Sequence, residues 1–434
     1  MEQLFLGVAR EIITPEVGGQ LYGYGPDVIS ESVEDDLTAT AFYFKQGSTQ
    51  ALMLSLTVCL LQTELAQNIL SLIEQRFEIP KENCMLCATH THSGPSTAGQ
   101  IGWGVIDQKY CDEIFIPAIL SAVEKATNNL QIVKMGFAQG DSLVGINRRE
   151  ITENNTIKLG QNPWGCFNPK MTVISFADAE GRNIANMIHY GAHGTAAGTN
   201  HEISRDWSGI MIDTLEKQSG AITAFFNGPE GDVGPRISNQ LTVGDLSYVR
   251  ELGSVAAQDA VGIFEKIFSY TDVTLDVSAK ELNIPLKSRI TYEKAKIMLE
   301  EYKDGTINIG GMIKSQLQEI IASYENDFEE ETHMDFRQTA IALGDIVFAS
   351  FPYELFSEIG MRIDKACKTK SVLSLSNTNG SEGYFITQDA ICRGGYEVDM
   401  FLYGHLQPFC DNADFYLMQE TVKHIKSMKN KSEE

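Results

Sequence analysis

Short apolar runs that suit buried β-strands alternate along this chain with amphipathic stretches that suit α-helices. Residues 51–61 are typical of a buried strand, apolar side chains at helical spacing predict a helix over 65–77, and 84–92 is again strand-like. Further helices are expected at 114–128, 207–218 and 245–268, and further strands at 38–44, 133–138, 171–176, 184–189 and 339–351. This alternation predicts an α/β protein of layered sheets flanked by helices (αββα-like).

The sequence contains no internal repeat, low-complexity tract or obvious linker, so we expect one domain over residues 1–434. Hydrophobic residues make up 43% of the chain, which is enough for a real core. The segment 293–327 is charged and mostly helical, with an expected interruption at 308–311. By its position we expect that segment to cover or line a substrate entrance.

The charge balance excludes some classes of partner. The 34 lysines and arginines are outnumbered by 58 aspartates and glutamates, giving a net charge of −24, and the cations are scattered. A nucleic-acid-binding surface needs clustered cations to release counterions from phosphates, so no nucleic-acid partner is expected. An anionic membrane would be repelled for the same reason.

The longest apolar run, 51–61, is about half the roughly 20 residues that a spanning helix needs, so no transmembrane segment is expected. The first residues lack the basic region and apolar run of a secretion signal, which predicts a cytoplasmic protein. Eight cysteines spread over the chain favour reduced thiols, and the pair Cys84 and Cys87 falls in a buried strand, where a structural role is expected.

Five of the eight histidines fall in two short segments that each follow a predicted strand; they are His90, His92, His189, His193 and His201. The strand period of two predicts that His90 and His92 share one face, and the following Ser-Gly-Pro places them at the carboxyl end of the strand. Ligands bind at that end in α/β sheets. A His-x-His pair can present two nitrogens to a divalent metal, or one ligand and one base, but two satisfied polar groups at a sheet edge would look the same.

In the second segment, His189 and His193 stand four residues apart, and spacing alone does not say which one faces the site. Asp206 precedes a predicted helix, so it is either the helix N-cap or a carboxylate that orients an imidazole. The polar loop at 227–236 follows an apolar strand, and turn chemistry alone would explain its Gly, Pro, Asn and Asp residues.

Taken together, these segments resemble the catalytic domain of the neutral ceramidase family of zinc-dependent amidohydrolases. The resemblance rests on motifs in the family's order: GVAREIITP at 7–15, THTHSGP at 89–95, GINRR at 145–149, His193 followed by Ser204-Arg205-Asp206, NGPEGDVGP at 227–235, FPYE at 351–354, and the paired tyrosines of Gly383-Tyr384 and Gly395-Tyr396-Glu397. They cover almost the whole chain.

The resemblance implies one zinc per chain, held by His90, His193, Glu354 and Tyr384. It also implies that His92, Arg148 and Tyr396 surround the substrate carbonyl, where they would stabilise an oxyanion. Such a donor set suits zinc, which lowers the pKa of a bound water to near neutrality. Without the resemblance, Glu354 would pass as a surface acid and the two tyrosines as packing aromatics.

Three departures from the family pattern shape the functional hypothesis. Gly234 stands where the family has a serine, so no serine nucleophile can be assigned there and a zinc-activated water is favoured. Gly194 replaces a proline, and the family's C-terminal immunoglobulin-like domain is expected to be absent. The leading hypothesis is hydrolysis of a linear amide, such as an N-acyl group, in a small-molecule or lipid-like substrate. There are two alternatives. The first is hydrolysis of an ester, lactone or sugar-derived molecule, and the second is a non-catalytic binding role.

Overall fold

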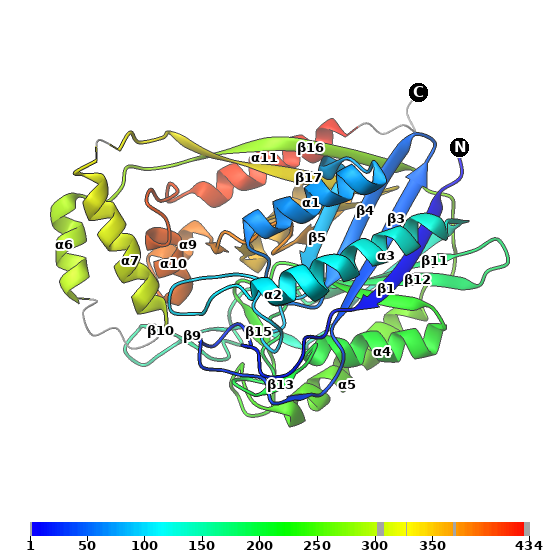
Figure 1. The fold of residues 1–434 in the computed structure, drawn as a ribbon, viewed down its shortest axis with the longest axis horizontal. Coiled ribbons are helices and arrows are strands. Elements are labelled where there is room, and N and C mark those ends of the chain that lie inside the picture. Colours follow the sequence, from blue (N-terminus) through cyan, green and yellow to red (C-terminus); the bar gives the residue numbers. More distant parts are fainter. Residues whose placement is uncertain (1, 302–307, 327, 368–369, 429–434) are drawn as a thin grey trace.

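Three β-sheets pack around a shared hydrophobic core in the computed structural model, which describes residues 2–301, 308–326, 328–367 and 370–428 (Figure 1). The first sheet has the order β5-β4-β3-β1-β6, the second β14-β12-β11-β7 and the third β16-β17-β18-β20. The strands of the first sheet are β1 (Phe5–Ile12), β3 (Thr38–Gln46), β4 (Thr49–Leu56), β5 (Cys84–Ala88) and β6 (Gln131–Ile132). Those of the second are β7 (Lys134–Asp141), β11 (Lys170–Ala177), β12 (Asn183–Tyr190) and β14 (Ile222–Asn227). Those of the third are β16 (Leu275–Pro285), β17 (His333–Leu343), β18 (Ile346–Ser350) and β20 (Ser371–Leu375).

Strands such as β3 and β18 are buried on both faces, and their alternate side chains serve two different cores. In β3, Phe42 and Phe44 point into the core between the sheets, whereas Tyr43 faces the helices outside. In β18, Phe348 points into the shared core and Val347 packs toward the outer helices. The period of two along a strand therefore explains why these strands are apolar almost throughout.

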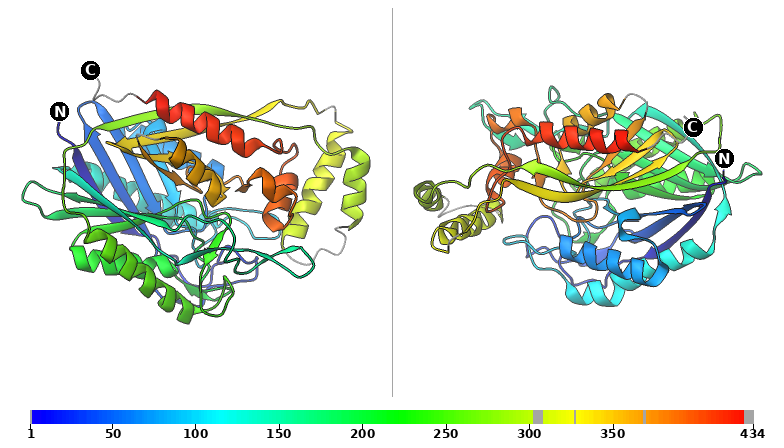
Figure 2. Two further views of the ribbon diagram at one scale, coloured as in Figure 1. Left: turned by 180° about the vertical axis from the view of Figure 1, so that it is seen from behind. Right: turned by 90° about the horizontal axis from the view of Figure 1, so that it is seen from above.

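Helices cover the outer face of each sheet. α1 (Thr63–Phe77) and α3 (Ile116–Asn128) cover the first sheet, α4 (Trp207–Ser219) and α5 (Leu246–Phe264) the second, and α8 (Ser357–Ala366) and α11 (Ala413–Ser427) the third (Figure 2). α6 (Tyr292–Glu301) and α7 (Asn308–Ser323) pack on each other at one end, with α10 (Tyr396–Tyr403) beside α7. The short elements are the helices α2 (Gln108–Tyr110) and α9 (Gln388–Ile391), and the strand pairs β2 (Ser32–Val33) with β13 (Glu202–Ile203), β8 (Gly145–Asn147) with β15 (Val233–Pro235), β9 (Arg149–Ile151) with β10 (Ile157–Leu159), and β19 (Glu354–Leu355) with β21 (Tyr384–Phe385). The layered α/β class, with sheets flanked by helices, is confirmed.

Several predicted boundaries were wrong. The strand expected over 84–92 ends at Ala88, and the helix expected over 245–268 ends at Phe264. The interruption expected at 308–311 is also wrong, because α7 begins at Asn308; residues 302–307, between α6 and α7, lie outside the described residues.

The cysteines behave as their spacing indicated. Cys84 and Cys87 are buried in β5, and none of the eight thiols, all within the described ranges, forms a disulfide. Among the described helices, we find none with the length and apolar character that crossing a bilayer requires.

Candidate metal centre

Two very short β-pairings bring together the residues implied as metal ligands. Thr91 pairs in parallel with Gly194, which places the loop after β5 against the loop after β12. In the strand pair β19 and β21, Glu354 is the direct partner of Tyr384. The four side chains therefore come from four separate chain segments.

His90 has an unusual backbone conformation. Its φ of 68° lies in the left-handed region, and its amide donates to the Val58 carbonyl instead of continuing the strand. The prediction that a regular strand pleat orients His90 and His92 is thus wrong, although their Nε2 atoms do lie 3.3 Å apart. A non-glycine residue in this region costs of order 1–3 kcal/mol, and such strain concentrates at functional sites.

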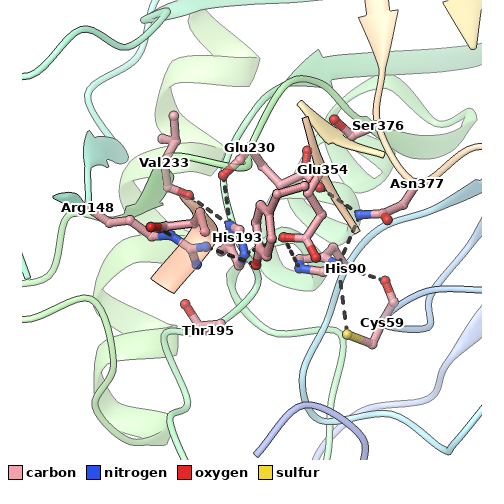
Figure 3. Close-up of polar contacts among 12 residues, drawn as sticks. Cys59, His90, Arg148, His193, Thr195, Glu230, Val233, Glu354, Ser376 and Asn377 are labelled. Atoms are coloured by element: carbon pink, nitrogen blue, oxygen red, sulfur yellow. Dashed lines mark hydrogen bonds and ion pairs between the residues drawn. The ribbon is translucent and has the colours of Figure 1, made fainter. Parts of the chain in front are cut away.

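His90, His193 and Glu354 form a compact buried cluster (Figure 3). The Oε2 atom of Glu354 lies 3.1 Å from His193 Nε2 and 3.6 Å from His90 Nε2. The two imidazole rings stand nearly perpendicular, with centroids 4.5 Å apart. All three side chains are at most 8% exposed.

Backbone carbonyls fix the tautomers of both histidines. Nδ1 of His90 lies 2.8 Å from the Cys59 carbonyl, and Nδ1 of His193 lies 2.9 Å from the Glu230 carbonyl and 3.1 Å from that of Val233. A carbonyl only accepts, so each Nδ1 carries the proton and each Nε2 presents a lone pair. This is the usual arrangement of metal-ligating histidines.

The ligand atoms of the cluster point toward one another, and no hydrogen-bond donor lies between them. Within the described part of the chain, neither His193 Nε2 nor Glu354 Oε2 has a hydrogen-bond partner. Two buried acceptors 3.1 Å apart repel each other unless a proton or a metal cation lies between them. Two neutral imidazole nitrogens and a carboxylate are a donor set that zinc accepts, so the residues present fit a zinc ion.

Burial sets the charge states that such a site needs. It lowers the pKa of His193 to about 3, and it also lowers the pKa of His90, so both rings are neutral near pH 7. Burial opposes ionisation of Glu354, but attraction to His90 and His193, when those rings are protonated, and to Arg148 outweighs it, so the pKa of Glu354 falls below its ordinary value. The cluster is therefore two neutral nitrogens and one carboxylate, the protonation states of metal ligands.

A second group of polar side chains borders the cluster. Arg148 donates from Nη2 to the Tyr384 hydroxyl at 3.0 Å, and the hydroxyls of Tyr384 and Tyr396 are 2.8 Å apart. The guanidinium also lies over both tyrosine rings, at 5.6 and 5.7 Å from their centroids. Glu397 accepts from Arg148 Nε at 3.1 Å and forms an ion pair with Arg149. Arg148 is thereby held with its charge beside both phenols.

His92 completes the set that the sequence singled out. The structure thus brings together all seven implied site residues: His90, His92, Arg148, His193, Glu354, Tyr384 and Tyr396. His92 packs against Gly23, whose φ is 130°; a Cβ there would lie 2.3 Å from His92 Nδ1. Any larger residue at position 23 would therefore displace the His92 ring.

Three residues flagged from spacing lie elsewhere or act differently. His189 Nε2 faces the Ser374 carbonyl at 2.9 Å, and His201 Nδ1 faces the Ile29 carbonyl at 2.6 Å, so neither joins the cluster. Asp206 caps α4 by accepting from the Trp207 amide. It also accepts from the amides of Ala196 and Ala197, which anchors the loop that carries His193.

Sequence reasoning missed a polar layer behind the cluster. Asn377 donates from Nδ2 to Glu230 Oε1 at 2.7 Å, and the same nitrogen lies 3.3 Å from His90 Nδ1. Glu230 is fully buried, and Asn377 has a φ of 44°. The only available signal was the run of Asn, Gly and Ser that follows an apolar strand at 371–375.

A cavity of about 290 Å³ opens in front of the cluster and reaches His90, His92, Glu354, Tyr384 and Tyr396. Met312 of α7 lines it, in line with the expectation that the segment 293–327 lines an entrance. A cavity that ends on convergent polar groups is the usual form of a small-molecule site.

The fold and the cluster define a layered α/β protein with a buried two-histidine, one-carboxylate centre at the base of a cavity. The family model for the N-terminal region of neutral/alkaline non-lysosomal ceramidases matches residues 5–249. The chain therefore belongs to that ceramidase family.

Individual relatives agree with the family model. Neutral ceramidase A of Dictyostelium discoideum is 26% identical over 247 residues, which is 52% of this chain and 35% of that protein. The neutral ceramidase of Pseudomonas aeruginosa is 24% identical over 220 residues, covering 45% of this chain and 32% of its own length. The matched region thus spans about a third of these curated relatives.

Solved structures extend the comparison over nearly the whole chain. The crystal structure of Pseudomonas aeruginosa neutral ceramidase superimposes with a TM-score of 0.74 and 18% identity, covering 98% of this chain and 74% of that one. A structure described as ceramidase complexed with C2 gives the same TM-score at 17% identity. These likenesses establish the fold.

Proposed function

We propose that this chain is a zinc-dependent hydrolase of linear amide bonds, similar to ceramidases, in which residues 1–434 form a single catalytic domain. The observation that carries the proposal is the convergence of His193 Nε2 and Glu354 Oε2, 3.1 Å apart and buried, with His90 Nε2 beside them. Membership of the ceramidase family supports an amide as the scissile group.

In this proposal His90, His193, Glu354 and Tyr384 hold one zinc ion per chain. When bound, the ion would polarise a substrate carbonyl and make a water acidic enough to attack near neutral pH. The backbone carbonyls of Cys59, Glu230 and Val233 keep both imidazoles in the ligating tautomer.

Arg148 and Tyr396 supply the electrostatic part of catalysis. The Tyr396 hydroxyl lies 2.8 Å from that of Tyr384, and Arg148 stands beside both with its charge fixed by Glu397. Donors fixed before the reaction stabilise the negative charge that develops when an amide carbonyl is attacked. His92 lies next to His90 at the cavity base, and in this proposal it exchanges a proton with the substrate.

Water is the nucleophile in this proposal, because the loop after β14 offers no hydroxyl at position 234. A Cβ at Gly234 would lie 2.7 Å from Thr242 Cβ and Cγ2, and 3.3 Å from Arg148 Cβ. A serine would therefore push on Thr242, and less closely on Arg148, which lies between β8 and β9.

The first test is the metal content of the purified protein by elemental mass spectrometry, with His90→Ala and Glu354→Ala prepared in parallel. We expect about one zinc per chain in the wild type and loss of zinc in both variants. A zinc-supplemented wild type that holds no metal would refute the proposal.

A panel of matched amides and esters then separates amide hydrolysis from the ester alternative. Chelation of the metal should abolish turnover. The cytoplasmic location stays a prediction, which cell fractionation would test.

A further inference from the structure

The cavity in front of the candidate metal centre is lined by acidic side chains and, among the described residues, by no lysine or arginine. Two carboxylates do line it, Glu354 at the base and Glu382 in the wall. The base carboxylate belongs to the proposed zinc site, so Glu382 gives the outer cavity a negative charge.

Glu382 is fixed in place by its surroundings. Its backbone amide donates to the Pro352 carbonyl at 2.7 Å, and its Oε1 accepts a hydrogen bond from the Thr63 hydroxyl. The residue is partly exposed, and no cationic side chain of the described ranges forms an ion pair with it. A carboxylate held by a neutral hydroxyl keeps its charge available to a ligand.

The histidine on this wall adds no positive charge, and the buried Arg148 lies behind Tyr384 and does not line the cavity. Nε2 of His405 faces the Glu382 carbonyl at 3.2 Å, and burial lowers the pKa of His405, so that ring is neutral near pH 7. Tyr22 and Trp103 also line the cavity, with ring centroids 6.4 Å apart. Aromatic rings and a carboxylate that line one cavity are typical surroundings for an ammonium group.

We propose that the cavity selects amide substrates that carry an ammonium group a few bonds from the scissile amide, with Glu382 as its partner and Tyr22 and Trp103 as neighbouring aromatic walls. This inference rests on the proposed amide hydrolase function and names its substrate class. The cavity of about 290 Å³ is at the lower end of the range for small-molecule sites, which suits a short amine-bearing amide.

The test uses three probes of equal length on the zinc-loaded, full-length chain: N-acetyl-1,4-diaminobutane, neutral N-pentylacetamide and anionic 4-acetamidobutanoate. Binding is measured by titration calorimetry, and turnover by release of acetate. We expect the ammonium probe to bind roughly 10-fold tighter than the neutral one, as for a hydrogen bond to a charged group, and the anion to bind weakest. Added salt should reduce the preference.

Glu382→Gln keeps an acceptor for Thr63 and removes the charge, so the ammonium preference should fall to about 1-fold. Glu64→Gln, an exposed acid on α1 next to Thr63, changes the net charge equally and should keep the preference. Equal binding of the three probes to the wild type would overturn the inference, even if Glu382→Gln did not fold. A preference for the ammonium probe that survives in Glu382→Gln would also overturn it.

Binding and turnover report on different proposals. A Glu382-dependent preference for the ammonium probe without hydrolysis of any amide would support the inference about the cavity and contradict the hydrolase. Hydrolysis of the neutral probe with no preference for the ammonium probe would leave the hydrolase standing and refute the inference.

Discussion

Glu397 should be among the most costly acidic residues to neutralise in this protein. It is fully buried and lies between two buried guanidiniums, accepting from Arg148 Nε at 3.1 Å and pairing with Arg149 through its other oxygen. Glu397→Gln keeps the size of the side chain and removes its charge. Two buried cations would then share a neutral amide, whose NH₂ group can only donate.

The expected loss is roughly 3–5 kcal/mol, the cost of leaving buried charges without their partner. The matched control is Glu358→Gln, because Glu358 pairs with Arg362 across one helical turn with side chains 35% and 43% exposed. Exposed pairs of that spacing contribute about 0.3–0.5 kcal/mol. The same chemical change should therefore differ about tenfold in free energy between the two sites.

Urea unfolding, followed by both circular dichroism and tryptophan fluorescence, measures the two losses and checks that the probes agree. The zinc-free protein should be used, so that a changed metal affinity does not enter the comparison. A loss below about 1 kcal/mol for Glu397→Gln, or one equal to that of Glu358→Gln, would refute this account of how Arg148 is held.

Three further predictions follow from the loops around the centre. His193→Ala should lower bound zinc from about one per chain to below about 0.1, whereas His189→Ala should retain it; elemental mass spectrometry decides, and zinc loss in the second variant alone would reverse the assignment. Burial raises the pKa of Asp206 from 3.8 to about 6, so between those pH values the unfolded chain has lost a proton that the folded chain keeps, and stability falls as pH rises. The full shift corresponds to about 3 kcal/mol. Urea unfolding between pH 3 and 7 should show nearly that much of the decline disappear in Asp206→Asn; an identical decline in both proteins would contradict the shift. Gly234→Ser should destabilise the fold by about 1–3 kcal/mol, because its Cβ would lie 2.7 Å from two Thr242 atoms; thermal melting at wild-type stability would show that the packing there is looser.

Local sequence patterns predicted the layers of this fold well, because a strand that is buried on both faces has a continuous run of apolar residues. Apolar runs such as the one in β4, and helical spacing such as that of α1, follow directly from the chain's own periodicity. β16, by contrast, was not predicted. Its 11 residues alternate between buried, partly buried and exposed positions, and they include several polar side chains, so its hydrophobic pattern is weak.

The local rule of strand alternation correctly predicted that His90 lies close to His92, but the physical reason it gave was wrong. The period of two predicted that His90 and His92 face the same way, and their Nε2 atoms are indeed close. The strand nevertheless ends at Ala88, and His90 takes a positive φ with its amide bonded to the Val58 carbonyl. That turn depends on a partner from another segment, which the residues around His90 do not reveal.

The candidate centre as a whole was out of reach of local patterns for a related reason. Glu354 and Tyr384 meet because β19 and β21 pair over only two residues, and the His90 and His193 loops meet through the single bridge between Thr91 and Gly194. Pairings this short leave no periodic pattern in the sequence. Only the family resemblance could therefore predict that these residues lie together. They are held because the large sheets on either side pack against the shared core and the outer helices. The chemistry at the centre therefore depends on the packing of the sheets, and variants that loosen the core between them should weaken zinc binding without touching a ligand.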